Sequence, residues 1–267
     1  MLAVVFPGQG SQQPDMRDRV AAVRPDLLDA LVKALGEDPF PRVDEGTRWA
    51  QPAIFAASLA AWSERPADAS APTWAAGHSL GELTALTVTG ALEESDAVDL
   101  VALRGRLMQE AGPGGMVALL GQGAAEAAPE IAAAHDLSVA NDNAPQQVVL
   151  SGARENLEPA ATAASEAGVR ATILPVAGAF HSPLMEPAHE PFRQALQSIS
   201  VRPPRIPVFS CVTAGPIDDV RATLADGILK PVRWRETVLA LHAAGAQSFE
   251  EVGPGRVLAG LIKRIVP

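Results

Sequence analysis

Cysteine is almost absent from the chain: Cys211 is the only one among 267 residues. A single cysteine cannot form an intrachain disulfide, and it excludes a zinc site built from several cysteines. Because Cys211 lies within the strand-like run of residues 208–212, we expect it to pack as a small apolar side chain.

Lysine is also scarce, with three residues, and 31 acidic side chains outweigh 21 basic ones to give a net charge of −10. This balance leaves no basic stripe to neutralise phosphates, so we expect no nucleic-acid partner. No apolar run approaches the ~18 residues that cross a bilayer, and residues 1–6 lack the basic start of a signal peptide. We therefore expect a cytoplasmic protein without a membrane partner, and a monomer.

What the sequence does have is a large apolar fraction, 48% of its residues, which is enough to bury a sizeable core. Short β-branched runs alternate with helical patterns, and this alternation predicts an α/β fold with a parallel sheet. Glycine-rich or polar residues follow each run, so the carboxyl ends of the strands should open onto a common crevice. The predicted strands are residues 2–6, 73–77, 207–212 and 247–252.

Residues 114–178 show a different order of patterns: strand, helix, two strands, helix and strand. This βαββαβ order is typical of the ferredoxin-like arrangement. We predict that it forms a small domain inserted into a larger, hydrolase-like α/β domain made of residues 1–113 and 179–267. The predicted elements of the small domain are residues 116–120, 124–134, 137–141, 147–151, 154–167 and 169–176.

Ser79 lies in the sequence Gly77-His78-Ser79-Leu80-Gly81, which places Gly-x-Ser-x-Gly between a predicted strand and a predicted helix. In that setting the pattern is typical of a nucleophile elbow. The flanking glycines permit a turn too tight for side chains, so the hydroxyl is exposed at the positive end of the next helix. We predict that Ser79 is a nucleophile, with an ordinary tight turn as the alternative.

A serine hydroxyl needs a neighbouring base, and the chain offers five histidines. We favour His181 because it follows the small domain on a loop that can overhang the crevice. On this reasoning alone, a structural role for His181 stays open. The other histidines are His78, which should point away from Ser79, His135 in the small domain, His189 in a polar segment and His242 on a solvated helix face.

The oxyanion formed when Ser79 attacks a thioester needs two preorganised donors. One is normally the N–H of the residue after the nucleophile, which here is Leu80. The second should come from a loop after another strand, and the glycines around Gln9 would let its backbone N–H approach a ligand. A plain glycine-rich turn is the alternative for Gln9.

Arg104 is the most informative charge in the sequence. Residues 95–110 have a helical pattern, and Leu100 and Met108 lie one turn from Arg104, so its guanidinium emerges from an apolar stripe. A charge there needs an anionic partner, whereas Arg106 should face solvent. Arg104 would therefore select an acid-bearing acyl group, unless it forms a structural ion pair with an internal carboxylate.

Eight motifs between Val5 and Ile265 resemble those of the malonyl-CoA:acyl carrier protein transacylase family, and they occur in the family's order. They are Phe6-Pro7-Gly8-Gln9-Gly10-Ser11-Gln12, Gln51-Pro52-Ala53, Gly77-His78-Ser79-Leu80-Gly81-Glu82, Arg104-Gly105, Asn143-Ala144-Pro145-Gln146-Gln147-Val148-Val149, Gly178-Ala179-Phe180-His181-Ser182-Pro183, Pro231-Val232-Arg233-Trp234 and Val252-Gly253-Pro254-Gly255. The resemblance implies that Ser79 is acylated, that His181 is the base, that the Gln9 and Leu80 amides hold the oxyanion and that Arg104 binds the malonyl carboxylate.

The resemblance also implies roles for residues around this set. Gln147 would line the site, and Asn143 would shape its small-domain wall. Phe180 resembles the malonyl-selective version of the family, in which a bulky side chain fills the space of an α-methyl group. One position departs from the family, because Gly227 stands where a glutamine usually supplies the carbonyl that orients the histidine. We expect the Gly227 carbonyl to keep that role.

The expected reaction is transfer of a malonyl group from malonyl-CoA to an acyl carrier protein, for fatty acid or polyketide synthesis, with no metal or redox cofactor. Because such carriers are acidic, we expect a local basic patch for docking. Three alternatives stay open: an acyl hydrolase, a non-catalytic carrier-binding module, and a transferase that serves a malonate decarboxylase carrier. The candidates for the basic patch are Arg202, Arg205, Arg233, Arg235, Arg256, Lys263 and Arg264.

Overall fold

The larger sheet of the molecule has five strands in the order β8-β7-β2-β1-β9. The computed structural model describes residues 1–176 and 178–266. Four strands are parallel, and the short β8 pairs antiparallel with β7. The predicted parallel α/β sheet is therefore confirmed: β1 has the predicted limits, and the other three predicted strands are shorter than the sequence patterns indicated. The strands are β1 (Leu2–Phe6), β2 (Trp74–Gly77), β7 (Val208–Ser210), β8 (Gly215–Pro216) and β9 (Ser248–Glu251).

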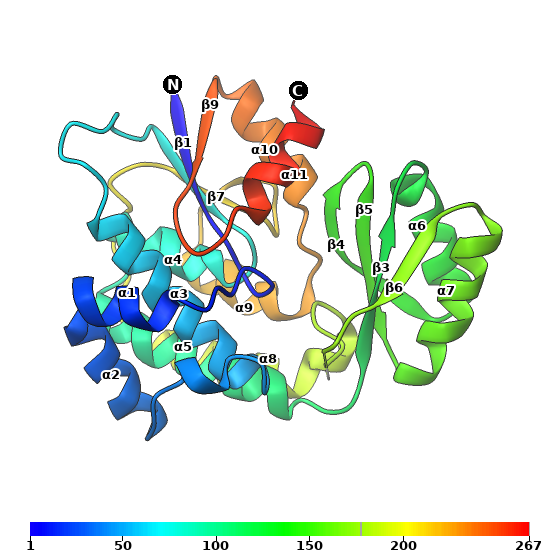
Figure 1. The fold of residues 1–267 in the computed structure, drawn as a ribbon, viewed down its shortest axis with the longest axis horizontal. Helices are drawn as coiled ribbons and strands as arrows, with labels where there is room; N and C mark the ends of the chain where they lie inside the picture. Colours follow the sequence, from blue (N-terminus) through cyan, green and yellow to red (C-terminus); the bar gives the residue numbers. More distant parts are fainter. Residues whose placement is uncertain (177, 267) are drawn as a thin grey trace.

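Helices cover both faces of this sheet because alternate side chains of β1 enter different cores. Val4 and Phe6 pack into the larger core, whereas Ala3 and Val5 pack against the final helices. The helices of the larger core are α1 (Met16–Val23), α2 (Pro25–Leu35), α3 (Thr47–Ser63), α4 (Gly81–Val88), α5 (Glu94–Glu110), α8 (Glu186–Gln197) and α9 (Val220–Leu229), and those of the opposite face are α10 (Trp234–Ala243) and α11 (Val257–Ile265) (Figure 1).

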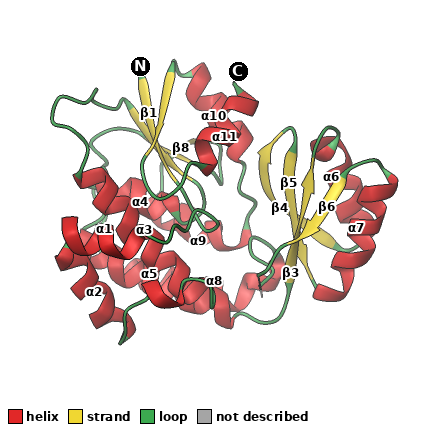
Figure 2. Cartoon of the chain, viewed as in Figure 1, coloured by secondary structure: helices red, strands yellow, loops and turns green. Residues whose placement is uncertain are grey.

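The second sheet is antiparallel, with the order β4-β5-β3-β6. Figure 2 shows two helices along one face of it. The order of elements, β3-α6-β4-β5-α7-β6, confirms the ferredoxin-like arrangement. The domain limits at residues 113/114 and 178/179 stay a prediction. The elements are β3 (Gly115–Leu120), α6 (Ala124–Ala134), β4 (Leu137–Ala144), β5 (Gln147–Gly152), α7 (Leu157–Glu166) and β6 (Arg170–Ile173).

A backbone contact joins β4 to the segment between α9 and α10. The N–H of Asp142 donates to the Val232 carbonyl at 2.8 Å, and the N–H of Val232 donates to the Ala140 carbonyl at 2.8 Å. The register of β4 against β5 shifts between Val139 and Asn141 and again between Asp142 and Ala144, in the part of β4 that makes this contact. The contact places the second sheet beside the loop after α9.

Short 3₁₀ helices complete the chain: η1 (Phe40–Arg42), η2 (Arg154–Asn156) and η3 (Pro183–Met185). Among the described residues, none of the helices combines the length and the apolar character needed to cross a bilayer.

Candidate active site

The turn between β2 and α4 holds Ser79 in a strained conformation. Ser79 has φ +51°, a left-handed value that is unusual for a residue with a side chain. A Cβ on Gly77 would lie 1.9 Å from the Gly81 carbonyl carbon, and a Cβ on Gly81 would lie 2.1 Å from the Phe6 oxygen. Both glycines are therefore required by close backbone approach, as expected for a nucleophile elbow.

The side chains of His181 and Ser79 are in contact. Its Nε2 lies 2.9 Å from Ser79 Oγ, and its Nδ1 lies 3.2 Å from the Lys230 carbonyl oxygen. A carbonyl can only accept a hydrogen bond, so Nδ1 carries the ring proton and Nε2 presents a lone pair to the hydroxyl. The structure thus brings together the two residues that the sequence pointed to, in the geometry of a base and its nucleophile.

The carbonyl that orients His181 differs in part from expectation. The hydrogen bond goes to Lys230, where the backbone turns out of α9 into an extended conformation. The Gly227 backbone also acts on His181, since it raises the pKa of the imidazole. Gly227 lies in the last turn of α9, and Pro231 four residues later has no N–H to pair with its carbonyl. We expected the Gly227 carbonyl to orient His181, but the hydrogen bond in the structure goes to the Lys230 carbonyl.

Burial and nearby positive charge keep His181 neutral. Burial is the main effect that lowers the pKa of His181 to about 3, and the Arg104 and His78 charges lower it further. A neutral imidazole is the form that can accept the Ser79 proton.

Arg104 lies on α5 with its guanidinium beside the Ser79 hydroxyl. Its Nη2 donates to Ser79 Oγ at 3.1 Å, its Nη1 donates to Gln51 Oε1 at 2.7 Å, and only 4% of the residue is exposed. Burial lowers the pKa of Arg104 to about 10, which Glu82 partly opposes. None of the ion pairs in the described part of the chain includes Arg104, so the structural ion pair gains no support. Arg106, as expected, is largely exposed and pairs with Glu110.

The two predicted oxyanion donors have free backbone N–H groups. Within residues 1–176 and 178–266, neither the Gln9 N–H nor the Leu80 N–H donates to a protein acceptor. Leu80 precedes the first residue of α4, where the helix dipole favours negative charge. The side chain of Gln9 is fixed by Thr47, whose Oγ1 donates to Gln9 Oε1 at 2.5 Å. Both amides are therefore available to a developing negative charge.

Among the described residues, His181 is the histidine whose side chain contacts Ser79 Oγ, and the other four make different contacts or lie elsewhere. His78 Nε2 lies 2.7 Å from Asn143 Oδ1, so the side chain of His78 joins the turn to β4. His242 is exposed and bonds the Ala246 carbonyl, and His135 and His189 are half-buried outside the site.

Three further residues were predicted to line the site: Asn143, Phe180 and Gln147. Asn143 is buried and contacts His78, which agrees with a role in the small-domain wall. Phe180 is 9% exposed and lies beside His181, with its ring against Gly178. Gln147 begins β5 opposite Ala144, and its role at the site stays a prediction.

The sequence reasoning missed a buried support beneath the turn. Cys211 is buried as expected, but its Sγ also accepts a hydrogen bond from the Ser79 N–H at 3.4 Å. Glu82 Oε1 accepts hydrogen bonds from Ser210 Oγ at 2.7 Å and from the Cys211 N–H at 2.6 Å. Burial raises the pKa of Glu82. The buried Glu82 thus ties α4 to β7, a role that the spacing of charges in the sequence does not reveal.

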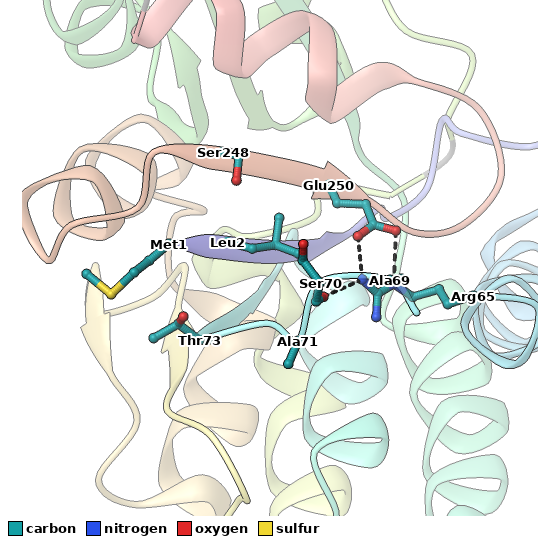
Figure 3. Close-up of a pocket in the computed structure, with 9 residues that line it drawn as sticks. All are labelled: Met1, Leu2, Arg65, Ala69, Ser70, Ala71, Thr73, Ser248 and Glu250. Atoms are coloured by element: carbon teal, nitrogen blue, oxygen red, sulfur yellow. Dashed lines mark hydrogen bonds and ion pairs between the residues drawn. The ribbon is translucent and has the colours of Figure 1, made fainter. Parts of the chain in front are cut away.

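A separate pocket of about 380 Å³ lies at the end of the large sheet away from Ser79. Figure 3 shows the residues that line it. Its wall includes Leu2, Thr73 and Ser248, at the amino ends of β1, β2 and β9. The Arg65 side chain at its edge is already bonded to Glu250. Ser79 follows the carboxyl end of β2, so this pocket does not belong to the candidate site. No group of three or more His, Cys, Asp or Glu residues suited to a metal ion occurs among the residues that the structure describes.

The chain matches known proteins over nearly its whole length. The family model described as "Acyl transferase domain" matches residues 4–266. The chain is 39% identical over 289 residues to the malonyl CoA-acyl carrier protein transacylase of Escherichia coli (strain K12), covering 99% of this chain and 92% of that protein. The chain belongs to the malonyl-CoA:acyl carrier protein transacylase family. The chain is also 37% identical over 280 residues to the polyketide biosynthesis malonyl CoA-acyl carrier protein transacylase PksC of Bacillus subtilis (strain 168). This match covers 99% of this chain and 97% of PksC.

Two further matches are a much longer relative and a solved complex. The polyketide biosynthesis protein ThaF of Burkholderia thailandensis is 39% identical over 282 residues. The match covers 100% of this chain but only 24% of ThaF. A solved malonyl-transacylase in complex with a type II PKS acyl-carrier protein, PlMCAT:AntF, superposes with a TM-score of 0.89 at 37% identity, covering 99% of this chain and 93% of that chain. The chain thus matches some relatives over nearly their whole length and ThaF over about a quarter of it.

Proposed function

We propose that this chain transfers a malonyl group from malonyl-CoA to the phosphopantetheine thiol of an acyl carrier protein, through an acyl-enzyme on Ser79. The observation that carries the proposal is Arg104, a buried cation 3.1 Å from the nucleophile. An acyl group with a free carboxylate supplies the anion that this guanidinium needs. The transacylase relatives support the same donor.

The first half-reaction forms the acyl-enzyme. His181 Nε2 takes the Ser79 proton while Oγ attacks the thioester carbonyl, and the Gln9 and Leu80 amides stabilise the oxyanion. The carbon–sulfur bond then breaks, and the CoA sulfur leaves with the proton held by His181. Malonyl-Ser79 remains, with its carboxylate on Arg104.

The second half-reaction reverses these roles. The carrier thiol gives its proton to His181 and attacks the Ser79 ester, and the same amides hold the second oxyanion. When the ester bond breaks, Ser79 Oγ recovers the proton from His181. The chemistry needs no metal or redox cofactor, because His181 moves the proton and Arg104 holds the acyl charge.

Selectivity and docking form a finer part of the proposal. Phe180 beside His181 would exclude an α-methyl group, while Gln147 and Asn143 would complete the wall. Arg202, Arg233 and Arg235 already form ion pairs with carboxylates of this chain, which weakens them as candidates for binding the carrier. Arg256, Lys263 and Arg264 on or beside α11 take part in none of the ion pairs of the described chain, so we propose this end for the acidic carrier. We also propose a cytoplasmic monomer.

Intact-protein mass spectrometry tests the proposal directly. The protein is mixed with malonyl-CoA, acetyl-CoA or methylmalonyl-CoA, with Ser79→Ala as the control. A malonyl adduct that is absent from the control, exceeds the other adducts and passes to holo-carrier is the expected result. Accumulating free malonate without transfer would favour an acyl hydrolase, and carrier binding without any adduct would favour a non-catalytic module. Comparing fatty acid, polyketide and malonate decarboxylase carriers identifies the acceptor.

A further inference from the structure

A chain of hydrogen bonds connects the oxyanion loop to the nucleophile through the start of α3. Thr47 Oγ1 donates to Gln9 Oε1 at 2.5 Å, and Gln51 Nε2 donates to Thr47 Oγ1 at 3.0 Å. Arg104 then donates to Gln51 Oε1 at 2.7 Å and to Ser79 Oγ at 3.1 Å. Thr47 is therefore the joint between the Gln9 loop and the Arg104 side.

The direction of these hydrogen bonds is fixed at Arg104, because a guanidinium can only donate. Gln51 must therefore present its carbonyl oxygen to Arg104 and its NH₂ to Thr47. The Thr47 oxygen accepts this bond, so its single hydroxyl proton is used toward Gln9. Thr47 and Gln51 are both 2% exposed, so water competes little for either position.

The contact that holds Arg104 is uncharged, and this matters for substrate choice. A carboxylate in the place of Gln51 would neutralise the guanidinium inside the protein and compete with an acyl carboxylate. The amide oxygen orients the guanidinium without neutralising it. A Cβ on Gly105 would lie 2.8 Å from the Thr47 carbonyl oxygen, so α5 approaches α3 closely enough for this contact only because residue 105 is glycine.

We propose that Thr47 is a positioning residue for acyl selectivity: through Gln51 it holds Arg104 by a neutral oxygen, and through Gln9 it aligns the oxyanion loop. This inference rests on the proposed malonyl transfer and adds a residue that acts without touching the acyl group. Its effect should fall mainly on acyl groups that carry a carboxylate. Loss of the Thr47–Gln9 contact should also lower the acylation rate with every acyl donor, but to a smaller extent.

The test measures acylation of Ser79 by malonyl-CoA and by acetyl-CoA in matched variants. Thr47→Val should lower the malonyl-over-acetyl preference about fivefold, the factor expected for losing one neutral hydrogen bond, and should raise the KM for malonyl-CoA. Thr47→Ser keeps the hydroxyl and should restore the preference. The control is Thr89→Val, which removes an equally buried hydroxyl that bonds only its own helix region and should leave the preference unchanged.

A second variant keeps the test decisive if Thr47→Val does not fold. Gln51→Glu preserves the shape but pairs Arg104 internally, so malonyl acylation should fall at least tenfold while acetyl acylation changes much less. An unchanged malonyl-over-acetyl ratio in Thr47→Val or in Gln51→Glu, with normal malonyl acylation in the wild type, would overturn this inference alone. A wild type that forms no malonyl adduct would overturn the proposed function, and this inference with it.

Discussion

Ser79 and His181 share an unusual backbone conformation at the point where their side chains meet. Ser79 has φ +51° and His181 has φ +59°, and their Oγ and Nε2 atoms lie 2.9 Å apart although 102 positions separate them in the chain. Left-handed backbone at a residue with a side chain costs free energy and persists only where the surrounding structure enforces it. The Ser79–His181 contact therefore depends on two strained backbone positions, one in the turn after β2 and one just before η3.

The strain at Ser79 predicts an inverted order of stability for two substitutions. Ser79→Gly should be more stable than Ser79→Ala by roughly 1 kcal/mol, because glycine adopts a positive φ without steric cost. Urea unfolding of the two variants measures the difference. At exposed Ser165 within α7 the order should be the usual one, with alanine more stable than glycine. The same order at both positions would mean that the Ser79 backbone is not strained.

Arg104 should determine the preference for an acyl group with a free carboxylate. Arg104→Ala should lower malonyl acylation of Ser79 by about a hundredfold, because it removes a charge-assisted contact to the acyl carboxylate. Acetyl acylation should fall far less. The matched control is Arg106→Ala on the same helix, since Arg106 is exposed and pairs only with Glu110. Equal losses with both acyl donors would assign Arg104 a structural role.

Glu82 should matter as a hydrogen-bond acceptor rather than as a charge. Glu82→Ala leaves the Ser210 hydroxyl and the Cys211 N–H without their acceptor, so we expect a loss of roughly 2–4 kcal/mol in the free energy of unfolding. Glu82→Gln keeps an oxygen in place and should cost at most about 1 kcal/mol. Chemical denaturation compares them, with exposed Glu130→Ala as the control. Equal effects of the two Glu82 variants would show that the negative charge itself is required.

Local sequence patterns were sufficient for the features that depend on neighbours in the chain. The limits of β1 agree with the apolar run of residues 2–6, and the turn around Ser79 needs Gly77 and Gly81 because a Cβ on either residue would lie 1.9–2.1 Å from backbone atoms. Such close approaches leave a signature in the sequence, since only glycine fits. The arrangement of β3 to β6 was predictable for a similar reason, because it follows from the order of elements.

Contacts between distant segments could not be predicted in the same way. The Lys230 carbonyl reaches His181 because the backbone leaves α9 in an extended conformation, and any residue type could supply that carbonyl. Cys211 was expected only to fill space in the core, yet its sulfur lies beneath the Ser79 amide. The Thr47 joint depends on how closely α3 and α5 cross. In each case the tertiary packing, and not the local residue pattern, determines the partner.

The low pKa of His181 predicts an unusual pH profile for acylation. Because burial and the Arg104 charge lower the pKa of His181 to about 3, the imidazole stays neutral as the pH falls well below 6.5. Only the neutral form accepts the Ser79 proton, so kcat/KM for acetyl-CoA should stay flat from pH 8 to about 5 and decline only at lower pH. Acetyl-CoA is the suitable probe because its acyl group has no ionisable carboxyl.

A bound malonyl carboxylate should shift this profile toward higher pH. The anion on Arg104 offsets the positive charge that disfavours protonation of His181, so the pKa of His181 should rise in the malonyl complex. The acid limb of kcat for malonyl-CoA should therefore lie at higher pH than the limb for acetyl-CoA, and Arg104→Ala should remove most of that difference. Rapid-quench acylation from pH 4 to 8 compares the two donors: acetyl acylation should stay nearly flat over this range, whereas malonyl acylation should already decline toward pH 4. An acetyl-CoA limb centred near pH 6.5 would mean that His181 titrates as an ordinary exposed histidine, and the coupling to Arg104 would then have no basis.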